Sequence, residues 1–212
     1  VNPLRLGYGL TRDWVLGLQV VSPQGRVLTL GSELVKNVAG YDLVRLHLGA
    51  WGRLGLLARV TVRLLPLPEA SVLAEARWEY GVDSVAVVDE WIRAVLTDGT
   101  QPASLEVSAG PGRELRVLAD FVGPEVGVSA RAGAHAWGAL HVADARAAAW
   151  ESQVEENRAV AAALPWRARV SVEVPGLRRL LPAVGAVGGD EWYLRGHAGS
   201  GVYYFSWQDE RG

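Results

Sequence analysis

The stretch LGSELVKNVAGYDLVRLHLGAWGRLGLLARVTVRLLPLP, residues 30–68, joins a short helical pattern, a run of spaced glycines and a long strand pattern. From residue 56 onward the side chains alternate with a period of two, and the prolines at 66 and 68 close the run. This pattern predicts a strand. The side chains expected on one of its faces are Leu56, Ala58, Val60, Val62 and Leu64.

A short helix is predicted just before the glycines, over residues 43–48. Asp42 precedes it and can accept backbone N–H bonds, and Gly49 follows it as the residue that ends it in the left-handed conformation. Because a helix of two turns is marginal in isolation, we expect packing of Leu43 and Leu46 to hold it.

Three glycines then recur at every third position, at Gly49, Gly52 and Gly55. Without a Cβ, such residues adopt positive φ values and let a backbone approach a flat or anionic ligand closely. The alternative is that they only make the helix-to-strand turn tight, since three glycines alone are a weak signal.

The pattern KNVAGYDLVRL at 36–46 followed by GAWGRLG at 49–55 resembles the second half of the FAD-binding domain in vanillyl-alcohol-oxidase (PCMH-type) flavoproteins. The resemblance is greatest to the FAD-binding E subunits of bacterial glycolate oxidases. It implies FAD as cofactor, and the residues it makes candidates for the site are Lys36, Tyr41, Gly49, Gly52, Gly55 and Leu56. Ala50 and Arg53 replace a serine and a threonine of the usual family pattern, so backbone contacts are the ones expected to survive.

The segment RLGYGLTRDWVLGLQVVSPQGRVL at 5–28 resembles the same family, which makes Tyr8, Gly9 and Asp13 secondary cofactor candidates. Alternatively, Tyr8 is a packed aromatic side chain and Asp13 a cap or a surface charge. Within this segment the turn residues at 22–25 separate two strand patterns and predict a β-hairpin.

Relatives in this family carry, ahead of this region, a subdomain whose glycine-rich loop wraps the FAD pyrophosphate. No glycine loop that opens a helix in this way occurs in the 212 residues, so we expect the FAD site to be incomplete in this chain. The first residue is valine and the chain has no methionine, which suggests a truncated or processed start that lacks this N-terminal subdomain.

Composition narrows the class of protein. A net charge of −2 argues against binding nucleic acid, and the absence of cysteine excludes disulfides, thiol catalysis and iron–sulfur ligation by this chain. No apolar run is long enough to span a membrane and no signal peptide pattern opens the chain, so a cytoplasmic location is expected. Attachment to the inner membrane through partner subunits is the alternative.

After residue 68 the patterns predict a second domain. Strands are expected over 72–80, 104–109, 114–121, 167–174 and twice within 192–207, with helices over 83–96, 144–164 and 177–181. The helix over 144–164 is expected to place Trp150, Val154, Ala161 and Leu164 on its buried stripe. We therefore predict an α+β protein: the C-terminal part of a PCMH-type FAD-binding domain at 1–68, then a cap domain at 69–212 with an antiparallel sheet covered by helices on one face.

Catalytic side chains are not evident in the sequence. HAGSGVYY at 197–204 resembles a family motif in which two histidines and an acid help to form a metal site, but Ser200 and Tyr204 replace the acid and the second histidine. We therefore expect no metal here and no catalytic residue in this chain. His47, His135 and His141 are expected to face solvent or to make local hydrogen bonds.

Two interpretations follow. In the first, which the family resemblance implies, the chain is a subunit of an FAD-dependent glycolate (2-hydroxy acid) oxidase or dehydrogenase that works with a second flavoprotein subunit and an iron–sulfur subunit. In the second, it is a non-catalytic scaffold of that complex that binds no FAD by itself. Arginines at 167, 169, 178 and 179 could bind a small carboxylate or an acidic partner, although a solvated surface also explains them.

Overall fold

The computed structural model describes residues 4–31, 41–135 and 137–208. These residues form two compact units, which are considered separately: a smaller unit within residues 9–67, and a larger unit made by residues 4–8 and 68–208. Among the described helices, none has the length and hydropathy of a membrane span.

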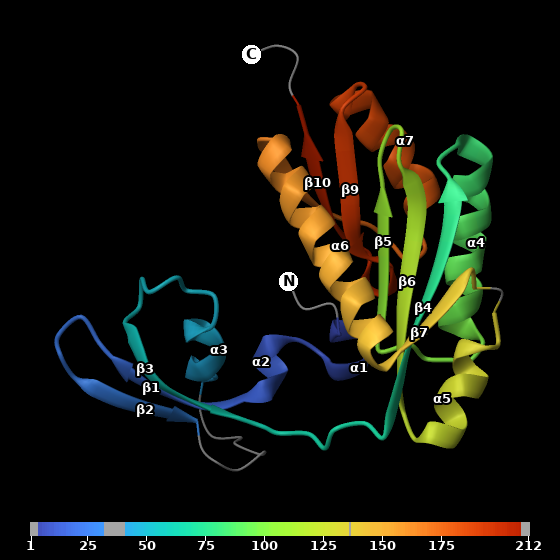
Figure 1. Cartoon of the computed structure of the whole chain (residues 1–212). Helices are drawn as coiled ribbons and strands as arrows, with labels where there is room; N and C mark the ends of the chain where they lie inside the picture. The colour runs from blue at the N-terminus through green and yellow to red at the C-terminus, as the bar shows by residue number, and fades with distance from the viewer. Residues whose placement is uncertain (1–3, 32–40, 136, 209–212) are drawn as a thin grey trace. The chain divides into compact units, whose positions relative to one another are not determined.

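The smaller unit is a three-stranded antiparallel sheet of order β2-β1-β3 with two short helices (Figure 1). Its elements are α2 (Thr11–Trp14), β1 (Val15–Val21), β2 (Val27–Gly31), α3 (Leu43–His47) and β3 (Leu56–Val62). The predicted hairpin is confirmed, because Val21 pairs with Val27 and the N–H of Gly25 donates to Ser22 O at 2.9 Å across the turn.

Helix α3 is capped as predicted, since the Asp42 side chain accepts a hydrogen bond from the N–H of Arg45 at 3.0 Å. The expected packing of Leu43 and Leu46 is wrong: these side chains are 42% and 57% exposed. The helix instead turns Val44 inward, against a small core of Leu18, Val20 and Leu30.

Strand β3 exists where the alternation predicted it, but no residue in it is buried. Only Thr61 is half-buried, and the six other residues of the strand are exposed. The described part of the smaller unit therefore presents much apolar surface to solvent.

The larger unit is built on a seven-stranded sheet of order β7-β4-β6-β5-β9-β10-β8, in which every neighbouring pair is antiparallel (Figure 1). Its strands are β4 (Ala70–Glu79), β5 (Ser104–Ala109), β6 (Glu114–Gly123), β7 (Ala139–Val142), β8 (Trp166–Ser171), β9 (Trp192–His197) and β10 (Val202–Trp207). Its helices are α1 (Arg5–Tyr8), α4 (Val82–Thr97), α5 (Glu125–Ala132), α6 (Ala143–Ala163), α7 (Leu177–Gly188) and the 3-10 turn η1 (Ala198–Ser200).

One face of this sheet carries the main hydrophobic core. Helices α4, α5 and α7 pack on it, and the helical spacing predicted for α4 is confirmed because Val85, Val88, Ile92 and Val95 are all buried. Alternate apolar side chains of β4, β5 and β6 meet them from the sheet, as the period of two requires.

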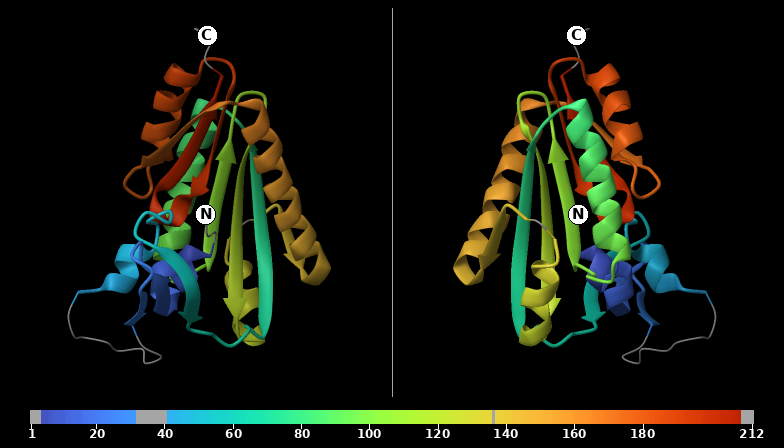
Figure 2. Two further views of the ribbon diagram at one scale, coloured as in Figure 1. Left: turned by 90° about the vertical axis from the view of Figure 1, so that its left-hand side faces the viewer. Right: turned by 90° about the vertical axis from the view of Figure 1, so that its right-hand side faces the viewer.

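The opposite face is covered in part by α6, which lies across the strands on the side away from α4 and α7 (Figures 1 and 2). The expectation that helices cover only one face is therefore wrong. The predicted stripe of α6 is also wrong in part, because Val154 is exposed while Gln153 and Val160 are buried. A search for apolar residues alone missed this stripe, since its first two-thirds is mainly polar.

Four further elements differ from the sequence prediction. Helix α5 and strand β7 were not predicted, and β8 ends at Ser171 rather than at residue 174. Helix α7 continues past Pro182 to Gly188, although proline removes one backbone hydrogen bond from a helix interior. Burial of Leu177, Leu181 and other side chains on one face offsets that cost.

Candidate active site on the polar face of the sheet

The sheet face beneath α6 is unusually polar for a covered surface. Alternation along β5 places Ser104, Glu106 and Ser108 on this face, and β9 adds Arg195 and His197 in the same way. Buried polar side chains need partners. Several of those on this face are buried, so their contacts define what the face can do.

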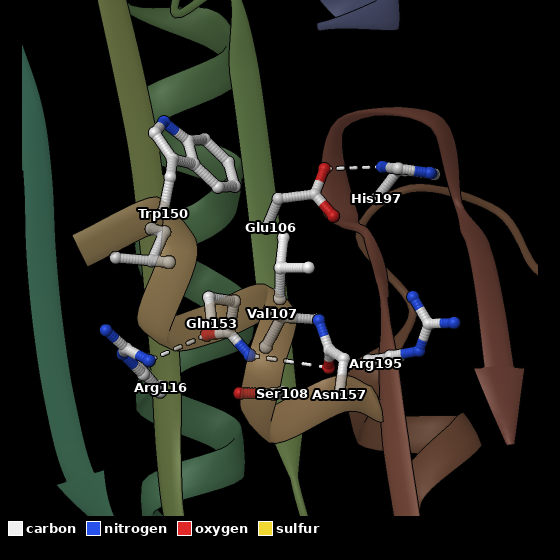
Figure 3. Close-up of a pocket in the computed structure, with 11 residues that line it drawn as sticks. Glu106, Val107, Ser108, Arg116, Trp150, Gln153, Asn157, Arg195 and His197 are labelled. Atoms are coloured by element: carbon white, nitrogen blue, oxygen red, sulfur yellow. Dashed lines mark hydrogen bonds and ion pairs between the residues drawn. The ribbon is translucent and has the colours of Figure 1, made fainter. Parts of the chain in front are cut away.

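A cavity of about 120 Å³ opens on this face between the sheet and α6 (Figure 3). Strands β5, β6 and β9 form its floor, and Trp150, Gln153, Val154 and Asn157 of α6 form a wall. Pockets for drug-sized ligands run to roughly 300–1,000 Å³. This pocket therefore suits a ligand of only a few heavy atoms.

At one end of the pocket, Nδ1 of His197 donates a hydrogen bond to Oε1 of Glu106 (Figure 3). The two side chains are 6% and 17% exposed, respectively. Burial raises the pKa of the Glu106 carboxyl, and the contact with His197 and the charge of Arg195 oppose that rise. The contact fixes the imidazole and leaves Nε2 as the ring nitrogen that has no partner among the described residues.

Arg195 lies two residues before His197 on β9, so both side chains project from the same face, with Cα atoms roughly 7 Å apart. Its guanidinium lies 5.3 Å from the centre of the Tyr204 ring, and the His197 ring meets the same tyrosine edge-on. Within the described residues no carboxylate lies within 4.0 Å of Arg195. Its donors are therefore available to an anion.

The other arginine of the pocket, Arg116, is already engaged. It donates to Glu75 at 2.5 Å and to Gln153 at 2.8 Å, and Glu75 also contacts His141 at 3.0 Å. Burial alone would raise the pKa of Glu75, but its bond to His141 and the charges of Arg116 and Arg77 outweigh that and hold its pKa below 4.5. This network is structural, and it leaves Arg195 as the ligand-facing cation.

The residues predicted from the family resemblance lie elsewhere. Tyr8 ends α1 of the larger unit and is half-buried, while Gly9 begins the smaller unit with φ +79°. Tyr41 is 95% exposed just before α3. Lys36 lies outside the described residues.

The glycine cluster separates into two kinds of position. Gly49 and Gly52 have φ of +85° and +76°, and a Cβ added to either would meet nothing within 4 Å. At Gly55, by contrast, a Cβ would come within 2.7 Å of both Val20 Cγ1 and Val21 O. Gly55 is therefore required by packing against β1, whereas Gly49 and Gly52 present open backbone, and Leu56 after them is exposed.

These residues fit part of a flavin site. Trp51, between the two open glycines, is itself in the left-handed region with φ +53° and is exposed. The loop thus offers unobstructed main chain and an aromatic ring to a flat ligand. The role of these residues in binding FAD stays a prediction.

The sequence interpretation missed Glu106, Arg195 and the pairing of His197. A signal was present, because Glu106 and Arg195 occupy alternate positions in strands whose other residues are mainly apolar. What could not be read was that β5 and β9 are neighbours, so that Glu106 lies opposite His197. Among the described residues, no group of three or more His, Cys, Asp or Glu side chains is placed to hold a metal ion.

Comparison with known proteins adds relatives by sequence, although no family model matches the chain. The chain is 37% identical over 127 residues to glycolate oxidase subunit GlcD of Bacillus subtilis. This alignment covers 60% of this chain and 26% of the relative. It is 40% identical over 91 residues to glycolate oxidase subunit GlcE of Escherichia coli, which covers 42% of this chain and 25% of that one. A D-2-hydroxyglutarate dehydrogenase of Stutzerimonas stutzeri is 49% identical over 57 residues, or 27% of this chain and 12% of the relative.

Solved structures share the fold over nearly the whole chain. An alkyldihydroxyacetonephosphate synthase aligns with 99% of this chain and 48% of its own, with a TM-score of 0.70 and 16% identity. A berberine bridge enzyme aligns with 98% of this chain and 49% of its own, with a TM-score of 0.60 and 14% identity. The chain spans about a quarter of the length of the two glycolate oxidase subunits. The resemblance inferred from the residues is confirmed: the chain is similar in sequence to glycolate oxidase subunits, and it shares its fold with the alkyldihydroxyacetonephosphate synthase and the berberine bridge enzyme.

Proposed function

We propose that this chain takes part in the FAD-dependent oxidation of a small 2-hydroxy acid, as a subunit of a glycolate-oxidase-type complex. In this proposal a second flavoprotein subunit and an iron–sulfur subunit complete the complex. The names of its relatives support the class of reaction, because they refer to glycolate and to D-2-hydroxyglutarate.

The observation that carries the proposal is the pair of groups on β9. Arg195 offers a guanidinium without a carboxylate partner among the described residues, and His197 offers an imidazole held by Glu106. A 2-hydroxy acid has a carboxylate and a hydroxyl on adjacent carbons. One cation and one proton acceptor on the same strand face match these two groups in kind.

Each side chain then has a defined task. Arg195 binds the substrate carboxylate through two N–H donors, and the Tyr204 ring beneath it restricts the guanidinium. His197 Nε2 accepts the hydroxyl proton, while the Glu106 carboxylate accepts the hydrogen bond from Nδ1 and stabilises the resulting imidazolium. Helix α6 limits access of water to the pocket.

When bound, FAD supplies the two-electron acceptor that this chemistry requires. The residues of this chain that would hold it are those of the open loop, through the backbone of Gly49 and Gly52 with Lys36 and Tyr41 in support. Gly55 and Leu56 continue that loop into β3.

The experiment is to co-purify the chain with its partner subunits and to measure bound flavin and glycolate- or lactate-dependent reduction of an artificial electron acceptor. Replacing His197 by Asn should lower kcat by roughly 10²–10⁴-fold with flavin content unchanged. His141→Asn is the matched control, since His141 also pairs with a glutamate of this sheet but does not line the pocket.

The alternative is a scaffold subunit that binds no FAD. Full flavin content and a selective loss of turnover in the His197 variant support the redox function. Absence of flavin even with the partners present would overturn it and leave the scaffold function. Equal activity of the His197 and His141 variants would remove His197 from the mechanism.

A further inference from the structure

Helix α6 uses one continuous stripe to face the sheet. Its members recur at intervals of four and three residues, and they are Arg146, Trp150, Gln153, Asn157, Val160 and, just past the helix, Leu164. The first two-thirds of this stripe is mainly polar and the last third is apolar. The helix is therefore attached to the sheet in two different ways.

The C-terminal end is held by apolar packing, because Val160 and Leu164 form a buried cluster with Tyr193 of β9. The N-terminal end is held by an ion pair. Arg146 donates to both oxygens of Asp120 on β6, through Nε at 2.9 Å and Nη2 at 2.5 Å. The wall of the pocket, formed by Trp150, Gln153, Val154 and Asn157, lies between these two attachments.

The ion pair differs from the surface pairs of this protein. The Asp120 side chain is 0% exposed, and a bidentate arginine contact fixes direction as well as distance. Breaking such a pair leaves a buried carboxylate without its cation, which is strongly unfavourable. This ion pair therefore attaches the first turns of α6 to the sheet, while Gln153 and Asn157 further along the helix contact Arg116 and Tyr193.

We propose that Asp120 and Arg146 are positioning residues: their ion pair sets α6 as the wall of the pocket and so controls how tightly the 2-hydroxy acid is held. This proposal rests on the proposed function for the identity of the ligand. Neither residue lines the pocket, so the ion pair acts through Trp150, Gln153 and Asn157 rather than by touching the ligand. Without the ion pair, we expect the wall to loosen at its N-terminal side and to stay attached through Val160 and Leu164.

The test combines hydrogen exchange with kinetics on the chain in complex with its partner subunits. Arg146→Gln should speed amide exchange in residues 146–153 by about tenfold or more and leave residues 158–163 unchanged. It should raise KM for the hydroxy acid by about tenfold with little change in kcat. Arg146→Lys, which keeps the charge but not the bidentate geometry, should restore part of both effects.

Ser104→Ala is the matched control, because Ser104 lies opposite Asp120 on β5 and its buried hydroxyl has no hydrogen-bond partner among the described residues. It should leave exchange and KM unchanged. Should Arg146→Gln fail to fold, Asp120→Asn tests the same contact with a side chain of equal size. If both variants fold, the two combined should show coupling rather than additivity.

Three results would overturn the proposal: exchange that rises equally along the whole helix, exchange that does not change, or a fall in kcat at constant KM. Failure of the proposed function has a different signature. If the unmodified complex oxidises no 2-hydroxy acid, that function fails, whereas local exchange in residues 146–153 still decides whether the ion pair positions the helix.

Discussion

Two glutamates on the polar face, the buried Glu75 and the half-buried Glu106, should respond to pH in opposite directions. Burial raises the pKa of Glu106, so the folded chain holds this proton more tightly than the unfolded chain does. The stability that this gives is complete below pH 4.5, the ordinary value, and is lost as the pH rises through the raised pKa. Replacing Glu106 by Gln removes this loss, so the stability of the variant relative to the wild type should increase as the pH rises above 4.5.

Glu75 is the matched comparison, because its pKa is lowered: burial acts against this, but the bond to His141 and the arginine charges prevail. The stability that the ionised Glu75 side chain gives to the fold is present above pH 4.5 and is lost as the pH falls through the lowered pKa. Glu75→Gln should therefore be less stable than the wild type at pH 7 and approach it at acidic pH. Urea unfolding midpoints of each variant and the wild type across a pH series measure both differences. If the midpoint difference between variant and wild type changed with pH in the same direction for both glutamates, the opposite pKa shifts would be contradicted.

At the scale of the elements, the glycine loop before β3 offers a test that separates packing from ligand binding. Gly55→Ala should destabilise the smaller unit by about 2 kcal/mol or more, since the new Cβ meets the Val21 carbonyl and φ is +150°. Gly52→Ala meets open space and should cost only about 1 kcal/mol of backbone strain.

Gly25→Ala is the control for Gly52→Ala, because Gly25 has φ +74°, also faces open space and lies in the β1–β2 turn. Retention of FAD after gel filtration of the complex is the measurement. If FAD lies against the loop, Gly52→Ala lowers retention and Gly25→Ala does not. Equal retention in both variants would leave Gly52 as a turn residue only.

Elements set by local chemistry were predictable from the sequence. The cap at Asp42, the turn at Gly25 and the stripe of α4 depend on neighbours a few residues apart, and each is confirmed. The stripe of α6 was not predictable in this way, because Arg146 and Gln153 are held against the sheet by partners on β6 that are distant in sequence. The Glu106–His197 pair was missed for the same reason, since it joins residues 91 positions apart.

At the scale of the whole molecule, the two units differ greatly in the core that supports them. The described core of the smaller unit is Leu18, Val20, Leu30 and Val44, whereas the larger unit buries side chains from two layers of helices and a sheet. Each fully buried apolar side chain contributes about 1.5–3 kcal/mol, and ordering each residue costs about 1–2 kcal/mol. We therefore expect the smaller unit to need additional contacts, with a ligand or with a partner subunit, to be stable.

Hydrogen exchange of the chain purified alone should show this directly. Amides of β1 and β3 should exchange orders of magnitude faster than those of β5 and β6. Unfolding of the smaller unit is enough to expose the former, whereas the latter exchange only when the large core opens. A ligand at a hundred times its Kd stabilises the bound state by about 2.7 kcal/mol, so adding FAD or the partner subunits should slow exchange in β1 and β3 by roughly a hundredfold. Slower exchange with FAD alone indicates that the flavin supplies the additional stabilising contacts. Slower exchange only with the partner subunits indicates that the subunits supply them. If amides of β1 exchange as slowly as those of β5 in the isolated chain, the smaller unit does not need additional contacts. Its four buried side chains would then be enough to keep it folded.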